Sequence, residues 1–287
     1  MKTDVMQVNQ QLRAAASAHK TLIASHRGSA TNGNIIENTI PAFQCGLLQH
    51  ADILELDVVA STDGKLFVFH DSENGRNEKR LLGVEKELRT LSSQEILSLR
   101  YINHDSVTTS QQVNAFDDVL EVLKGKCLLN VDRSWWFWDL VIPAIQRHGM
   151  LDQCIVKSEP DEEYLTYMAQ LDVPVMYSPK AYTAEDIDRI LCRDMNVVSC
   201  EMIFFDLNAD MLRPEIHQRL HQRGILCWCN ALKLRDDWNR SAHHDDNGAI
   251  TGDPDGHWGW LRDHDFDIIQ TDWPGLLHDY LTATGRR

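Results

Sequence analysis

Residues 53–71 read ILELDVVASTDGKLFVFHD, and this segment has the pattern of two strands joined by a short turn. The first part, residues 53–60, is an apolar, β-branched run of strand length. Only five residues separate it from a second apolar run at 66–70, which is too few for the crossover that joins parallel strands. We therefore predict a hairpin that turns at Asp63 and Gly64.

Similar apolar runs recur along the chain, and amphipathic segments of helix length separate them. This alternation is typical of a parallel sheet with crossover helices. If the hairpin fills one position, eight barrel positions remain, which predicts an α/β fold of the (β/α)8 TIM-barrel type. One helix should begin near Thr39, with Pro41 in its first turn, and another should span 116–123. The runs are residues 21–26, 53–60, 66–70, 127–132, 154–158, 173–177, 196–201, 225–230 and 267–272.

Two segments are too long to be simple connections between barrel elements. Residues 71–112 follow the second-strand hairpin, and residues 231–266, which are rich in aspartate, form a long acidic loop after the seventh barrel strand. Long segments of this kind in compact domains usually carry function or move. No linker-like tract divides the chain, so we predict a single domain over residues 1–287, with its barrel at about 21–280 and two insertions.

The charge and composition of the chain limit the kinds of partner that it can bind. The 28 Lys and Arg residues stand against 43 Asp and Glu residues, which gives a formal net charge of −15. Nucleic-acid phosphates and anionic bilayers repel such a chain, so we expect no nucleic-acid partner and no stable membrane association. The first twenty residues contain no apolar stretch of signal-peptide or transmembrane length, and the seven cysteines form no CxxC pair. We expect a cytoplasmic location.

Polar side chains end most of the predicted strands, and in (β/α)8 barrels the active site lies at the C-terminal ends of the strands. Glu55 and Asp57 are two residues apart, so both leave the same face of one strand. Buried carboxylates need a cationic partner, and oxygen ligands suit a hard divalent ion, with Asp132 as a third ligand. Taken singly, each residue is better explained as a satisfied polar side chain, but together they predict a site. The strand ends carry His26, Arg27, Glu55, Asp57, His70, Asp132, Lys157, Glu201, Asn230 and Asp272.

Five separated motifs resemble the glycerophosphodiester phosphodiesterase family, in its order and near its spacing. They are HRG at 26–28, ENT at 37–39, ELDV at 55–58, DG at 63–64 and HD at 70–71. The tail is similar to the last two strands of that family, through WCN at 228–230 and IIQTDWP at 268–274. The resemblance covers about residues 21–280 and implies a TIM barrel.

The resemblance also implies a role for each matching residue. The motif histidines, His26 and His70, would act as the general acid and base. Glu55 and Asp57 would bind a divalent metal ion, with Asp132 as the third ligand. Contacts to phosphate and substrate are expected from Arg27, Glu37, Lys157, Glu201, Trp228 and Asn230.

The third metal ligand departs from the common pattern of the family. Many members have Glu in an Asn-x-Glu-x-Lys strand, whereas residues 130–134 read NVDRS. The acid is therefore the shorter Asp132, and Ser134 stands where the family has Lys. A subgroup with Asp at this position has Lys at the end of the following strand, so Lys157 is expected to supply the missing positive charge.

These observations predict a phosphoric diester hydrolase that uses a metal ion to cleave a small glycerophosphodiester into an alcohol and glycerol 3-phosphate. Oxygen ligands favour one Mg²⁺ or Ca²⁺ ion, with Mn²⁺ as a third candidate. Two alternatives stay open. One is a lyase-like or agrocinopine-type sugar phosphodiesterase, and the other is a non-catalytic phosphoglycerol-binding barrel. An acidic rim formed by residues 231–266 should favour zwitterionic diesters, such as glycerophosphocholine, over strongly anionic ones.

Overall fold

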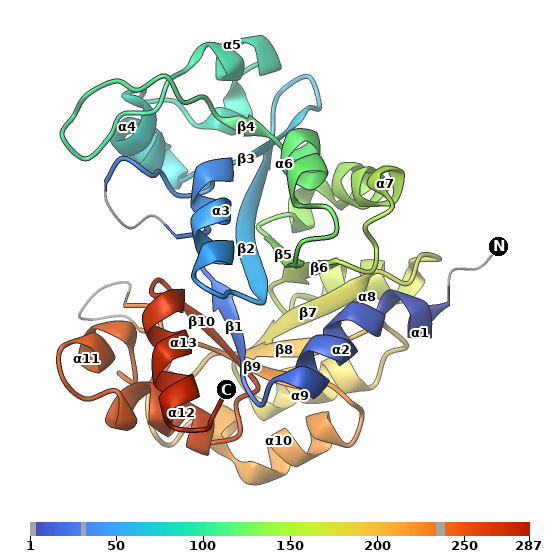
Figure 1. Ribbon diagram of the computed structural model, residues 1–287. Coiled ribbons are helices and arrows are strands. Elements are labelled where there is room, and N and C mark those ends of the chain that lie inside the picture. Colours follow the sequence, from blue (N-terminus) through green and yellow to red (C-terminus); the bar gives the residue numbers. More distant parts are fainter. Residues whose placement is uncertain (1–3, 30–32, 234–238) are drawn as a thin grey trace.

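The computed structural model describes residues 4–29, 33–233 and 239–287 (Figure 1). Within them, eight parallel strands form a closed barrel in the order β1-β10-β9-β8-β7-β6-β5-β2, which a β1–β2 pairing completes. The α/β barrel predicted from the sequence is thereby confirmed. The strands are β1 (Leu22–Ser25), β2 (Ile53–Ala60), β5 (Leu128–Asp132), β6 (Cys154–Ser158), β7 (Met176–Ala181), β8 (Ser199–Met202), β9 (Leu226–Asn230) and β10 (Ile268–Thr271).

The predicted hairpin extends the second barrel strand. β3 (Leu66–Val68) runs antiparallel to β2, with Val58 opposite Val68, and β4 (Asn114–Ala115) pairs with β3 in turn. Gly64 in the turn has a φ of 74°, a conformation that glycine adopts without steric cost. The return of the chain along β3 brings the residues that follow it, including His70, to the mouth of the barrel.

Helices cover the outside of the barrel, as the periodicity predicts. Thr39 caps the first of them, because its hydroxyl accepts the Ala42 N–H, and Pro41 lies in the first turn. No described helix is long and apolar enough to cross a membrane. The outer helices are α3 (Ile40–Leu48), α6 (Phe116–Leu123), α7 (Trp138–His148), α8 (Glu162–Gln170), α9 (Ala184–Leu191), α10 (Pro214–His221) and α13 (Pro274–Ala283).

Two helices that the sequence did not suggest lie before the first strand. α1 (Val5–Val8) and α2 (Gln10–Ala18) pack on the barrel through Val8 and Leu12. These side chains belong to one buried apolar cluster with residues from the barrel strands, among them Trp228. This apolar cluster fills the end of the barrel that α1 and α2 cover. The polar side chains lie at the opposite end, where the strands have their C-termini.

The two long segments contain short helices where the sequence showed little periodicity. Figure 1 shows the helices of the first segment beside β3 and β4, and those of the second segment beside α13. Trp258 of the second segment is buried and packs on Tyr280 of α13. The short helices are α4 (Arg76–Leu82) and α5 (Ser93–Ser98) in the first segment, and α11 (Asp246–Ile250) and α12 (Trp260–Asp263) in the second.

One strand lies later in the chain than its apolar run indicated. The run at 173–177 predicted the strand there, but β7 spans Met176–Ala181 and contains Ser178, Pro179 and Lys180. All of these residues are buried. Inward-facing polar side chains at the mouth of a barrel do not look apolar in the sequence, so the pattern ends before the strand does.

Candidate active site

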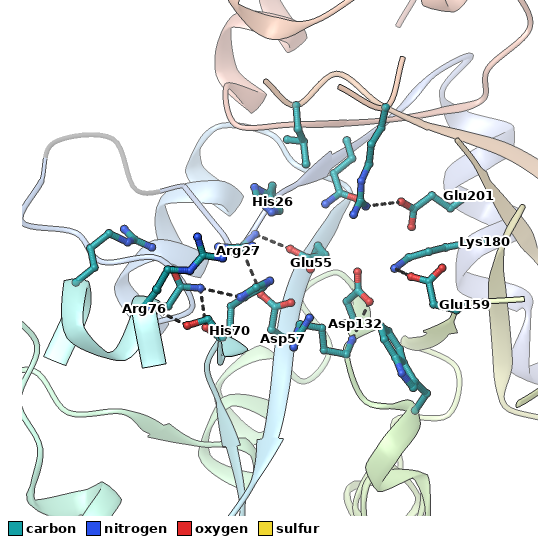
Figure 2. A pocket seen from close by; sticks show the side chains of 18 residues that line it. His26, Arg27, Glu55, Asp57, His70, Arg76, Asp132, Glu159, Lys180 and Glu201 are labelled. Atoms are coloured by element: carbon teal, nitrogen blue, oxygen red, sulfur yellow. Dashed lines mark hydrogen bonds and ion pairs between the residues drawn. The ribbon is translucent and has the colours of Figure 1, made fainter. Parts of the chain in front are cut away.

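A cavity of about 690 Å³ opens at the C-terminal ends of the strands (Figure 2). Most of the predicted site residues meet there, although they are far apart in the sequence. Glu37 lies in an adjoining cavity, which His26 and Arg27 also line. The predicted residues in the wall of the main cavity are His26, Arg27, Glu55, Asp57, His70, Asp132 and Glu201.

Three carboxylates form the centre of this cavity. Glu55 and Asp57 lie on β2 and are almost fully buried, and Asp132 ends the neighbouring strand β5 directly opposite Asp57. One oxygen from each lies within 4.8 Å of the others. Burial and the charge of Asp57 raise the pKa of Glu55 to about 8. A divalent cation would offset this repulsion and find oxygen ligands, so the donor set fits Mg²⁺ or Ca²⁺.

The loop after β1 holds two of these carboxylates in place. The backbone N–H of Arg27 donates to Glu55 at 2.8 Å, and the Asn38 amide donates to Asp57 at 2.8 Å. Arg27 and Asn38 both have positive φ, 52° and 59°, which few side chains adopt. Gly28 must be glycine, because a Cβ there would lie 2.5 Å from the Ala42 carbonyl carbon. The HRG and ENT motifs are therefore explained by this loop geometry.

The two histidines are held in different hydrogen-bonding states. His26 Nδ1 lies 2.8 Å from a carboxylate oxygen of Asp272, and a carboxylate only accepts, so Nδ1 carries the hydrogen. Burial and Arg27 lower the pKa of His26, but Asp272 outweighs them and raises it above its usual value. His70 Nδ1 instead lies 2.9 Å from the amide nitrogen of Asn77. That amide also donates to the His70 carbonyl, so Nδ1 of His70 is an acceptor.

The surroundings of His70 lower its proton affinity. Burial lowers the pKa of His70 to about 4, and the positive charges of Arg27 and Arg133 act in the same direction, against Asp57. The pKa values of the two histidines therefore move apart. His70 is therefore neutral at pH 7, whereas Asp272 favours a proton on His26.

Arg27 belongs to a network of ion pairs that extends from the main cavity to Glu37 and Arg80. Its guanidinium lies 3.2 Å from Asp57 and 2.7 Å from Glu37, and Glu37 also accepts from Arg80 at 3.1 Å. These two arginines lower the pKa of Glu37 to about 2, although burial opposes them. The Glu37 carboxylate thus fixes the position of the Arg27 side chain.

Lys157, Trp228 and Asn230 lie below the cavity wall rather than among the residues that line it. The Lys157 ammonium is fully buried, 2.6 Å from Glu201 and 3.7 Å from Asp132, and 4.5 Å from the centre of the Trp228 ring. The Asn230 amide donates to Glu201 at 2.6 Å. Lys180 is among the cations that line the cavity near Asp132, and it pairs with Glu159 at 2.7 Å.

Replacing Lys157 with methionine is expected to destabilise the fold by about 3–5 kcal/mol, because Glu201 and Asp132 lose a buried counter-charge. Urea unfolding measures this change. The double variant Lys157→Met/Glu201→Gln should recover part of the loss, because one of the unpaired charges is gone. A free energy of unfolding within about 1 kcal/mol of wild type for the single variant would contradict this account.

The sequence analysis missed several residues of the site. Lys180 follows the end of the predicted apolar run, and Glu159 follows a predicted strand directly. Arg76 lies in a segment without periodicity, and Asp246 lies in the acidic segment. Only Asp272, noted at the end of its strand, had a signal that could have identified it as the partner of His26.

The described aspartates of residues 231–266 do not form the expected acidic rim. Asp255 and Asp263 pair with Arg286 near the end of the chain. From this segment, Leu232 and Arg240 reach the cavity wall instead. Two further acidic residues of the segment, Asp236 and Asp237, lie outside the described residues.

The structure is a closed (β/α)8 barrel with a buried carboxylate cluster, two histidines and an arginine at the C-terminal ends of its strands, where barrel enzymes have their active sites. The family model described as "Glycerophosphoryl diester phosphodiesterase family" matches residues 26–134, and a model described as "Domain of unknown function" matches residues 172–281. A glycerophosphodiester phosphodiesterase of Caldanaerobacter subterraneus subsp. tengcongensis is 48% identical over 245 residues, which are 82% of this chain and 96% of that protein. The chain belongs to the glycerophosphodiester phosphodiesterase family, as its motifs predicted, and is an enzyme of that family.

The chain is also similar to a second bacterial sequence and to a solved barrel structure. An uncharacterized protein of Bacillus subtilis is 30% identical over 145 residues, and the match spans 48% of this chain and only 58% of that protein. A solved phosphodiesterase of Oleispira antarctica, in complex with the product sn-glycerol-3-phosphate, has a TM-score of 0.67 at 14% identity. That match covers 93% of this chain and 99% of the solved chain, and it shows the barrel fold alone.

Proposed function

We propose that this protein hydrolyses a small glycerophosphodiester to an alcohol and glycerol 3-phosphate with the help of one divalent metal ion. The observation that carries the proposal is the pair of histidines, held in opposite hydrogen-bonding states beside a buried cluster of three carboxylates. Family membership supports the reaction type. The product bound in the Oleispira antarctica structure supports glycerol 3-phosphate as the product.

Glu55, Asp57 and Asp132 would hold the metal ion, because their oxygens lie close together and are buried. Mg²⁺ or Ca²⁺ fits the ligand type, and Mn²⁺ is a third candidate. When bound, the ion supplies positive charge that stabilises the negative charge developing on the phosphoryl oxygens.

Arg27 is placed to bind and orient the phosphate. Its side chain lies in the cavity wall, and Glu37 and Asp57 fix its direction. One nitrogen of its guanidinium, Nε, is buried and lies 3.2 Å from an Asp57 oxygen, but not in the geometry of a hydrogen bond, so its N–H has no acceptor among the described residues. A phosphate oxygen would satisfy such a donor, and charged hydrogen bonds of this kind also stabilise the transition state.

The two histidines have different roles, one at the attacking hydroxyl and the other at the leaving oxygen. The His26 ring donates from Nδ1 to Asp272, so Nε2 is free to take a proton from the attacking hydroxyl, which belongs to water or to the glycerol part of the substrate. The His70 ring accepts from Asn77 at Nδ1, so its hydrogen is on Nε2. This neutral ring stabilises the charge on the leaving oxygen by a hydrogen bond, and the leaving oxygen takes its proton from water. Asp272 keeps His26 in the tautomer that a base requires, as a carboxylate does in a catalytic triad.

In this proposal, both inserted segments form one domain with the barrel. Asp71 of the first segment accepts from Arg133, which directly follows β5. Asp246 of the second segment accepts from Thr271 and from the Asp272 N–H at the end of β10. We therefore treat residues 1–287 as a single domain, in which these contacts connect each segment to the barrel.

A panel of glycerophosphodiesters, assayed with Mg²⁺, Ca²⁺ or Mn²⁺ and in excess chelator, tests the proposed function. We expect release of the alcohol with metal and none without. Binding of glycerol 3-phosphate without turnover of any diester would instead favour the non-catalytic alternative.

Asp246 offers a separate test of how His26 is positioned. Its carboxylate is buried and accepts from Trp258 at 2.8 Å, Thr271 at 2.8 Å and the Asp272 N–H at 2.9 Å. In Asp246→Asn, the amide leaves at least one of these donors unpaired. The end of β10 should then shift, and kcat should fall by about 10- to 100-fold, because small misplacements of a catalytic group are costly.

Steady-state kinetics and a far-UV CD spectrum measure the effect of Asp246→Asn. Asp279→Asn, an exposed change on α13, serves as the control and should leave kcat unchanged. A wild-type kcat in a folded Asp246→Asn variant would show that Asp246 does not position His26.

A further inference from the structure

The cavity has two chemically different ends on either side of the carboxylate cluster. Figure 2 shows Lys180 and Glu159 on one side of Asp132, and Arg27, His70 and Arg76 on the other side. At the first end, Glu159 accepts from Lys180 and from the Tyr182 hydroxyl, both at 2.7 Å. The charges there are balanced, and the paired donors and acceptors suit a neutral, hydroxyl-bearing group such as glycerol.

The other end is rich in unbalanced positive charge. Arg76 and Arg80 are four residues apart on α4, so they lie on the same face of this helix, and both line the cavity. Arg80 pairs with Glu37, whereas Arg76 has no acidic partner among the described residues. Like charges at this spacing destabilise a helix by a few tenths of a kcal/mol. An anion bound in the cavity would remove this repulsion.

The neighbouring arginines strengthen the imbalance. Arg89 and Arg133 both pair with the carboxylate of Asp71, and Arg89 also pairs with Glu87 at 3.5 Å. Arg133 Nε is buried without a hydrogen-bond partner among the described residues. Both guanidiniums also lie near the Trp136 ring, with Arg133 at 5.1 Å from its centre. This concentration of positive charge is local, because the whole chain carries a net charge of −15.

The proposed chemistry places the leaving alcohol at this end of the cavity. His70 is the donor to the leaving oxygen, and Asn77, which holds His70, directly follows Arg76 on α4. A leaving group within reach of His70 therefore extends toward Arg76 and Arg80. Substituents on that alcohol would meet two guanidiniums rather than an aromatic or acidic surface.

We propose that the preferred substrate is a glycerophosphodiester whose alcohol carries a second anionic group, a carboxylate or a phosphate, which Arg76 binds with the help of Arg80. This inference rests on the proposed function, because it assigns the substrate of the same site. It reverses the preference for zwitterionic diesters expected from the sequence, since Arg76 and Arg80 line the cavity and the described aspartates of residues 231–266 do not.

Two matched substrate pairs test the inference. Glycerophosphoserine and glycerophosphoethanolamine differ by one carboxylate, and glycerophosphoglycerol phosphate and glycerophosphoglycerol differ by one phosphate. We expect kcat/KM to be about 10-fold or more higher for the anionic member of at least one pair, as a charge-assisted hydrogen bond predicts. The pair that shows the preference identifies the anion as carboxylate or phosphate.

The variant Arg76→Gln should bring the ratio of kcat/KM within that pair close to one, and Arg76→Lys should restore part of it. Lys86→Gln is the matched control, because it removes an exposed positive charge from the same segment outside the cavity wall, and the ratio should stay at its wild-type value.

Two results would overturn the inference while the proposed function stands. The wild type could hydrolyse all four diesters without preference for an anionic member. Alternatively, Arg76→Gln could leave the ratio of kcat/KM within the pair unchanged. Absence of turnover for every diester in the presence of metal would overturn the proposed function, and this inference with it.

Discussion

Removal of divalent cations by excess chelator is expected to abolish hydrolysis, and Mg²⁺, Ca²⁺ or Mn²⁺ should restore it. The physical reason is the cluster of Glu55, Asp57 and Asp132, whose oxygens approach within 4.8 Å in a largely buried site. Without a cation, burial and the charge of Asp57 disfavour ionised Glu55. A divalent ion stabilises the ionised cluster and supplies the charge that phosphoryl transfer requires.

Two ligand variants make this first prediction specific to the cluster. Glu55→Gln and Asp57→Asn each remove one negative charge with little change in size, and each should weaken metal binding by roughly 10-fold or more. Isothermal titration with the metal alone measures this loss independently of turnover. Asp139→Asn, on α7, is the control for the charge change and should bind metal as the wild type does. Full activity after chelation and dialysis would refute the metal requirement.

Replacing His26 or His70 with alanine is expected to lower kcat by about 10²- to 10⁴-fold. The two losses should depend differently on the leaving group. His70 donates to the leaving oxygen, so a glycerol phosphodiester of p-nitrophenol, whose leaving anion is stable, should be much less sensitive to His70→Ala. His26 acts on the attacking hydroxyl, so His26→Ala should slow both kinds of substrate.

Kinetics on an alkyl diester and on the p-nitrophenyl diester separate these roles. His148→Ala serves as the control, because His148, the last residue of α7, pairs with Asp117 on α6 and lies outside the cavity wall. Equal losses on both substrates for both variants would contradict the division of roles. Wild-type rates in both variants would make the histidines structural.

The sequence predicted the parts of this protein that depend on local pattern. The strand period of two placed Glu55 and Asp57 on one face, and the five-residue gap after β2 predicted the hairpin that brings His70 to the mouth. Parallel strands of a barrel share one C-terminal end, so Asp132 could be expected beside Asp57 before any coordinates.

The remaining features depend on contacts that no local pattern records. Lys180 was missed because β7 continues past its apolar run through inward-facing polar residues. The contact of Asp246 with Asp272 joins residues from two different elements. The basic end of the cavity was missed because Arg76 lies in a segment without periodicity. The many aspartates of the other segment, residues 231–266, suggested an acidic rim instead.

Phosphorus NMR of the reaction with a glycerophosphodiester in the presence of Mg²⁺ or Ca²⁺ tests the central claim most directly. The account predicts that the diester resonance is replaced by the monoester resonance of glycerol 3-phosphate, with the alcohol released free of phosphate. A lasting cyclic phosphate signal, phosphate retained on the alcohol, or an unchanged diester with active metal present would contradict it.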